Sequence, residues 1–208
     1  MVTEIDNPAA DSKTNAPEPV PDGHWLNAPN SVTIARLGLS IVVFWMIYYE
    51  GLWISAAALF VVAASTDALD GYLARKYGQV TVLGRILDPF VDKFLICGAF
   101  VFLLEKKLDS GVNSWIVIIV IGREMFVSGL RGILEKEGKD FSASMAGKIK
   151  MVLQCAAVTG CLLSLSPKIK SDGFLMARDI VLWTAVAATV WSGLIYVHRA
   201  YKLFSSKH

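Results

Sequence analysis

The sequence predicts an all-α, polytopic membrane protein with six transmembrane helices. Hydrophobic residues make up 54% of the 208-residue chain, charged residues only 18%, and the mean hydropathy is +0.51. This apolar character extends over most of the chain, whereas a soluble domain needs a more charged surface. Six segments approach the roughly 20 apolar residues that a helix needs to cross a bilayer.

The N-terminal 22 residues have a different composition from the rest. They hold four of the seven prolines and five carboxylates against one lysine, so this arm carries a net −4 and the remainder of the +2 chain carries +6. Few large apolar residues are present to form a core, so we expect residues 1–22 to be a disordered acidic arm. Residues 23–31 then form a juxtamembrane segment, because Trp25 favours the membrane interface.

The predicted membrane domain spans residues 32–200 and is followed by a short basic tail, residues 201–208. Glu50-Gly51 predicts a tight turn between the first two helices, and Pro89 predicts a kink in the third because proline lacks a backbone donor. The predicted helices cover residues 32–49, 52–69, 81–104, 114–133, 149–165 and 174–197.

Lysine and arginine placement predicts the topology. With six spans, both termini lie on the same side as the loops after the second and fourth helices. The other side holds only Lys106, Lys107, Lys168 and Lys170, with Arg178 near it. The side of the termini carries Arg75, Lys76, Arg85, Arg131, Lys136, Lys139, Lys148, Lys150, Arg199, Lys202 and Lys207. The positive-inside rule therefore places both termini in the cytoplasm.

Four aspartates lie within or next to the second and third predicted helices. Asp67 and Asp70 are three residues apart, and Asp88 and Asp92 are four apart, so each pair occupies one face of a helix. Two such helices side by side gather four carboxylates, which repel one another unless cations bind. Hard oxygen ligands suit Mg²⁺ or Mn²⁺, so the spacing predicts a site for two divalent ions.

Gly71 and Arg75 indicate what these ions bind. Glycine lets a bulky ligand approach the backbone, and a guanidinium can bind phosphate with two hydrogen bonds. A metal-bound diphosphate is therefore the expected ligand. The alternative is that the four aspartates are solvated loop charges paired with Arg75, Lys76, Arg85 and Lys93.

The pattern Asp-x2-Asp-Gly-x2-Ala-Arg-x8-Gly-x3-Asp-x3-Asp, residues 67–92, resembles the signature of the CDP-alcohol phosphotransferases without a mismatch. The resemblance covers about residues 27–200. It implies six transmembrane helices around a polar cavity that faces the cytoplasm, and a homodimer. It further implies that Asp67 and Asp88 bridge two Mg²⁺ or Mn²⁺ ions, completed by Asp70 and Asp92, and that Asp92 is the general base.

The same resemblance implies the binding site for the CDP moiety. Gly71, Arg75 and Thr81 would contact it. Asn30 and Thr33 open the first helix in a segment that resembles the nucleotide-contacting segment of the branch that uses glycerol 3-phosphate, with Ala28 and Val32 in place of leucines. A role for Asn30 or Ser31 as helix N-cap alone is the alternative.

Basic residues of the fourth and fifth predicted helices suggest an acceptor pocket. Arg123, Glu124, Ser128 and Arg131 recur at helical spacing, and Lys148 and Lys150 open the next helix. The Arg-Glu-x3-Ser-x2-Arg and Gly-Lys-x-Lys patterns resemble the same branch, which implies that Arg123, Arg131, Lys148 and Lys150 bind the acceptor phosphate. A purely structural Arg123–Glu124 pair with the lysines as interfacial anchors is the alternative.

The resemblance thus implies an enzyme of a bacterial inner membrane that transfers the phosphatidyl group from CDP-diacylglycerol to glycerol 3-phosphate. Inositol phosphate, serine or phosphatidylglycerol remain alternative acceptors. Buried charges could instead form the ion path of a cation- or proton-coupled transporter, but the acids cluster at helix ends and the two halves show no matching interrupted helices. No aromatic-basic motif points to nucleic acid as a partner; membrane lipid is the expected surrounding.

Overall fold

The computed structural model describes residues 28–77, 82–136 and 145–205, and within these ranges the chain is helical, without strands. Helix α4 (Lys107–Ser110) is short and was not predicted. The other six helices coincide with the six predicted segments, which confirms the all-α expectation. They are α1 (Ala28–Tyr48), α2 (Trp53–Tyr77), α3 (Val82–Glu105), α5 (Ser114–Lys136), α6 (Met145–Ser164) and α7 (Asp172–Ser205).

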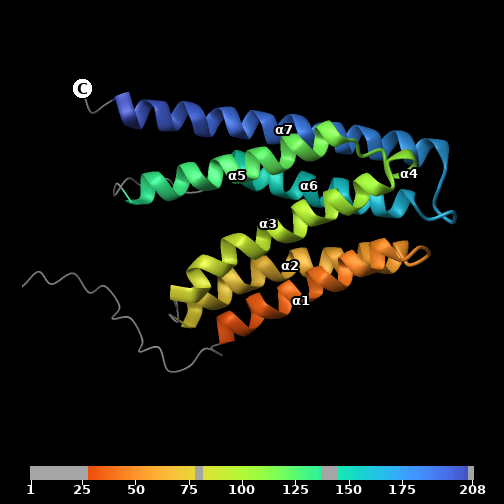
Figure 1. Cartoon of the computed structure of the whole chain (residues 1–208), viewed down its shortest axis with the longest axis horizontal. Helices are drawn as coiled ribbons and strands as arrows, with labels where there is room; N and C mark the ends of the chain where they lie inside the picture. Colours follow the sequence, from red (N-terminus) through yellow and green to blue (C-terminus); the bar gives the residue numbers. More distant parts are fainter. Residues whose placement is uncertain (1–27, 78–81, 137–144, 206–208) are drawn as a thin grey trace, which may run out of the picture.

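Successive long helices run in alternating directions (Figure 1). One end of the bundle holds the start of α1, the end of α2 and the start of α3, together with the end of α5, the start of α6 and the end of α7. We call this the α2–α3 end and the opposite one the α4 end. The predicted segments therefore connect up and down, as short loops between neighbouring antiparallel helices require.

Helix α3 contacts α1 and α2 as well as α5 and α6 (Figure 1). Helix α1 packs against α2 and α3, while α6 packs against α7 and α2, and α5 against α7 and α3. The main core lies among them and contains fully buried large side chains such as Phe60, Phe100 and Leu182. Its composition follows from the apolar segments, because apolar side chains on every helix can face a neighbour.

Helices α1 and α3 approach closely at Gly98. A Cβ at this position would lie 2.2 Å from the Phe44 ring. Phe44 is 7% exposed, and its ring stacks on Phe102 at 5.2 Å and meets Phe94 edge-on at 5.4 Å. The absent side chain of Gly98 is thus what lets the aromatic cluster form between the two helices.

The α4 end is tied together by polar contacts. Arg178 donates to the backbone carbonyl of Asp109 at 2.5 Å and to Ser164 Oγ at 3.2 Å, and it pairs with Asp179 at 2.8 Å. Lys170 pairs with Asp109 at 2.6 Å, and this contact lowers the pKa of the Asp109 carboxyl. These contacts connect α4 to the end of α6 and to the start of α7.

The structure corrects one helix start and lengthens two helices. Helix α1 already includes Ala28, so Asn30 and Ser31 lie inside its first turns and neither is the N-cap. Pro29 is compatible with this, because the missing N–H is not needed in the first turn. Helix α2 continues past residue 69 to Tyr77, and α7 continues past residue 197 to Ser205. The kink expected at Pro89 stays a prediction, within the unbroken helix α3.

Three helices of the described residues are long and apolar enough to cross a membrane. The apolar stretches are residues 31–48, 145–164 and 172–203. Large apolar side chains also lie on the outside of the bundle, including Trp45 (56% exposed), Ile118 (59%) and Trp183 (56%). Exposed apolar surface on this scale fits contact with lipid, which identifies the chain as an integral membrane protein.

Candidate active site

The four aspartates fall on two consecutive helices that contact each other. Asp67 and Asp70 lie on α2, and Asp88 and Asp92 lie on α3. The predicted spacings therefore fall on helical backbone, where each pair shares one face. Their side chains lie outside the part of the molecule that the structure describes, so the metal site remains a prediction. Among the described side chains, no other group of three or more His, Cys, Asp or Glu residues could hold a metal.

The predicted CDP-binding residues come from α1 and α2. Gly71 and Arg75 lie on α2, near its end, while Thr81 lies outside the described residues. On α1, Asn30 is helical and Thr33 is only 2% exposed. Arg36, one turn further on the same face, is 3% exposed. Thr33 and Arg36 therefore face the interior of the bundle rather than lipid.

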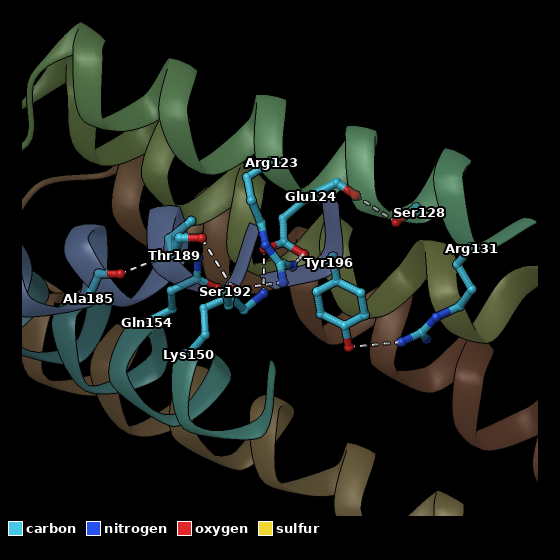
Figure 2. A network of polar contacts seen from close by, with 10 residues as sticks. All are labelled: Arg123, Glu124, Ser128, Arg131, Lys150, Gln154, Ala185, Thr189, Ser192 and Tyr196. Carbon is cyan, nitrogen blue, oxygen red and sulfur yellow. Dashed lines mark hydrogen bonds and ion pairs between the residues drawn. The ribbon is translucent and has the colours of Figure 1, made fainter. Parts of the chain in front are cut away.

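A compact charged network joins α5 to α6 (Figure 2). Arg123 Nη1 lies 3.3 Å from both carboxylate oxygens of Glu124, and Lys150 Nζ donates to Oε1 of the same carboxylate. Glu124 is 6% exposed and Lys150 is 7% exposed. Burial of these charges is costly unless they are paired, so the carboxylate between the two cations compensates much of that cost.

Helix α7 completes the network (Figure 2). Arg123 Nη2 donates to Ser192 Oγ at 2.8 Å, and Arg131 Nη2 lies 3.5 Å from the Tyr196 hydroxyl. Deeper in the bundle, Gln154 of α6 donates to Thr189 of α7 at 3.0 Å. The polar side chains of three helices thus form one continuous cluster inside an otherwise apolar bundle.

Three of the four predicted phosphate-binding residues belong to this cluster. Arg123, Arg131 and Lys150 are brought together around Glu124 and Tyr196. Lys148 is exposed on α6 and makes no ion pair or hydrogen bond with the cluster among the described residues. Two residues earlier on a helix is a rotation of about 160° away from Lys150, which explains the different environment.

Among the described side chains, this cluster has more cations than carboxylates, and two of its donors have no partner. The cations are Arg123, Arg131 and Lys150, and the carboxylate is Glu124. The Nε atoms of Arg123 and Arg131 are buried and have no hydrogen-bond partner within the described part of the chain. Buried donors without an acceptor are rare in folded proteins because each costs free energy. This arrangement is chemically suited to an anion with several oxygens, such as a phosphate.

The sequence patterns did not reveal the α7 partners. They are Thr189, Ser192 and Tyr196 of α7, a helix whose composition is that of an ordinary membrane span. The available signal was their spacing: Thr189, Ser192 and Tyr196 recur every three or four residues and so form one polar stripe on an apolar helix.

Comparisons with known proteins identify the family of this chain. The profile of the CDP-alcohol phosphatidyltransferase family matches residues 26–191. A Bacillus subtilis protein named CDP-diacylglycerol--glycerol-3-phosphate 3-phosphatidyltransferase is 36% identical over 198 residues, covering 88% of this chain and 99% of its own. A Rickettsia bellii protein of the same name is 36% identical over 181 residues, covering 86% and 97%.

A third relative carries a different name. A rice protein named cardiolipin synthase (CMP-forming) is 30% identical over 206 residues, covering 92% of this chain and 62% of its own. All three names describe enzymes, so the comparisons do not favour the transporter interpretation. With a profile match across most of its length, this chain belongs to the CDP-alcohol phosphatidyltransferase family of enzymes.

Proposed function

We propose that this protein transfers the phosphatidyl group of CDP-diacylglycerol to glycerol 3-phosphate, which yields phosphatidylglycerophosphate and CMP for phospholipid synthesis. The observation that carries the proposal is the cluster of buried Lys150 with the partly buried Arg123 and Arg131, whose two Nε donors have no partner among the described residues. An acceptor with a phosphate group supplies the oxygens that this cluster lacks. The names of the Bacillus and Rickettsia relatives support the same acceptor.

The aspartates fit a site for two divalent cations, Mg²⁺ or Mn²⁺. Asp67, Asp70, Asp88 and Asp92 would hold the ions. The support is the donor chemistry: four hard carboxylates at helical spacing on two helices in contact. When bound, the ions neutralise the diphosphate and stabilise the charge that develops on it during transfer.

The chain's own residues then bind and activate the substrates. Gly71 and Arg75, with Asn30, Thr33 and Thr81, hold the CDP moiety. Asp92 takes the proton of the acceptor hydroxyl, whose oxygen forms the new bond to the β-phosphorus as the bond to the CMP oxygen breaks. Positioning contributes more than basicity here, because a carboxylate is a weak base.

The position of α3 supports a pocket beside the aspartates. Helix α3, which carries Asp88 and Asp92, packs against α5 and α6, which carry the cluster. The aspartates and the basic residues therefore belong to helices in contact with one another, which supports one pocket for the acceptor phosphate and the acceptor hydroxyl.

We further propose that all six long helices cross a bacterial inner membrane, with both termini and a polar cavity on the cytoplasmic side. The alternating helix directions support an even number of crossings (Figure 1), and the lysine and arginine distribution supports the orientation. In this arrangement residues 1–22 are an acidic arm, 23–31 a juxtamembrane segment, 32–200 the catalytic membrane domain and 201–208 a basic tail. The functional unit is a homodimer.

CMP release tests the proposal. Detergent-purified protein is given CDP-diacylglycerol and Mg²⁺ with glycerol 3-phosphate, inositol phosphate, serine or phosphatidylglycerol, with and without a chelator. We expect chelator-sensitive release with glycerol 3-phosphate alone. Release with one of the other acceptors instead would retain the aspartate chemistry and overturn the assignment of the basic residues to glycerol 3-phosphate. Absence of release with every acceptor would overturn the proposal.

A further inference from the structure

Three residues of α7 lie around Arg123, and Figure 2 draws two of them, Ser192 and Tyr196. Ser192 Oγ accepts from its Nη2 at 2.8 Å, and the Tyr196 ring centroid lies 5.5 Å from its guanidinium carbon. Between them, Gly193 leaves room for the side-chain stem, because a Cβ at Gly193 would lie 3.3 Å from Cγ of Arg123. We call Ser192, Gly193 and Tyr196 the α7 cradle.

The α7 cradle is itself held in place. Ser192 is fully buried, and its hydroxyl donates to the Thr189 carbonyl at 3.2 Å. A hydroxyl has a single proton, so this bond leaves its lone pairs for Arg123. Tyr196 is 2% exposed and packs with Val127, Leu134 and Ala200 in a small core of its own between α5 and α7.

Tyr196 also connects the two arginines of the cluster. Its ring contacts the Arg123 guanidinium, while its hydroxyl lies 3.5 Å from Nη2 of Arg131, at the long limit of a hydrogen bond. Glu124 and Ser192 accept from Nη1 and Nη2 of Arg123, whereas its Nε has no partner among the described residues. The Nε of Arg131 likewise has none there. Contacts with the protein thus orient the Arg123 guanidinium, while the Nε donor of each arginine is unused within this part of the chain.

We propose that the α7 cradle positions Arg123 and Arg131 to bind the acceptor phosphate, and that it selects phosphorylated over unphosphorylated acceptor alcohols. This inference rests on the proposed function. The support is the set of contacts above: Ser192 and Tyr196 touch Arg123, Tyr196 lies next to Arg131, and the Nε of each arginine has no partner among the described residues.

Steady-state kinetics of the full chain in detergent test the cradle. Ser192→Ala removes the acceptor of Arg123 Nη2, Tyr196→Phe removes only the hydroxyl, and Tyr196→Leu removes the ring as well. Tyr201→Phe is the matched control, because Tyr201 lies on the same helix and is 70% exposed. CMP release is followed while one substrate is varied and the other is saturating.

We expect Ser192→Ala and Tyr196→Leu to raise the KM for glycerol 3-phosphate by about tenfold, since each loses one interaction with a charged group. Tyr196→Phe should have a smaller effect because the ring remains. The KM for CDP-diacylglycerol should not change, and the preference for glycerol 3-phosphate over glycerol should fall in parallel. A merely structural role would not separate the two KM values.

The outcomes separate a failure of the cradle proposal from a failure of the proposed function. Size-exclusion chromatography and thermal unfolding establish that each variant is folded. If Tyr196→Leu does not fold, Ser192→Ala and Tyr196→Phe still test the cradle. Equal changes in both KM values, or an unchanged KM for glycerol 3-phosphate in folded Ser192→Ala and Tyr196→Phe, would overturn the cradle and leave the proposed function intact. A wild-type protein that releases no CMP with glycerol 3-phosphate would instead remove the proposed function and the cradle with it.

Discussion

Replacement of Glu124 by glutamine tests whether the charged cluster depends on its single carboxylate. The change keeps the side-chain shape but removes the negative charge between Arg123 and Lys150. At 3.3 Å and an effective dielectric constant of 20, one such pair is worth about 5 kcal/mol before desolvation. Removing one partner of a buried pair typically costs about 3–5 kcal/mol, because the remaining charge is left uncompensated.

Thermal unfolding in detergent measures this loss. For a chain of this size, about 2–4 °C of Tm corresponds to each kcal/mol, so we expect Glu124→Gln to lower Tm by about 6–20 °C. The matched control is Glu50→Gln, which removes the same charge from a 2.9 Å pair with Lys106 in which Glu50 is 78% exposed. An exposed pair contributes about 1 kcal/mol or less, so this control should shift Tm by no more than about 4 °C.

A second substitution separates charge from packing. Lys150→Met in the Glu124→Gln background removes the cation that lost its partner, and it should recover part of the lost Tm. If Glu124→Gln and Glu50→Gln shift Tm equally, or if the double variant is less stable than Glu124→Gln, the carboxylate does not hold the cluster together and the reasoning is refuted.

Three further predictions concern other parts of the molecule. Asp92→Asn should abolish CMP release while equilibrium binding of CDP-diacylglycerol persists; strong residual turnover would refute the general-base assignment. Gly98→Ala should lower the unfolding free energy by about 1–3 kcal/mol, because the new Cβ overlaps the Phe44 ring, and an unchanged Tm would contradict the close packing of α1 on α3. Lys170 lowers the pKa of Asp109, so this pair stabilises the fold above the ordinary Asp pKa of 3.8 and loses its effect as the pH falls below that value. Asp109→Asn should therefore weaken the fall in Tm on acidification. An identical dependence of Tm on pH in the wild type and the variant would argue against the pair.

Much of the fold could be predicted because it depends on local composition. Each of the six long helices appears where a run of apolar residues approaches the length of a membrane span. Helix ends were less predictable. Asn30 or Ser31 was a candidate N-cap of the first helix, but the helix begins earlier because Pro29 suits a first turn. Helix α2 extends through Asp70 and Arg75 because their charges do not prevent helix formation, only burial in lipid.

By itself, the sequence determined the helices, the family and the helical spacing of the aspartates, since all of these are patterns between residues close together in the chain. Only the tertiary structure decided which residues surround the basic cluster. Ser192 is separated from Arg123 by 69 residues and Tyr196 from Arg131 by 65. Lys148 and Lys150 seemed equivalent in sequence, yet one is exposed and the other is buried against Glu124. Such differences arise from how helices pack against each other, which depends on side chains distant in sequence.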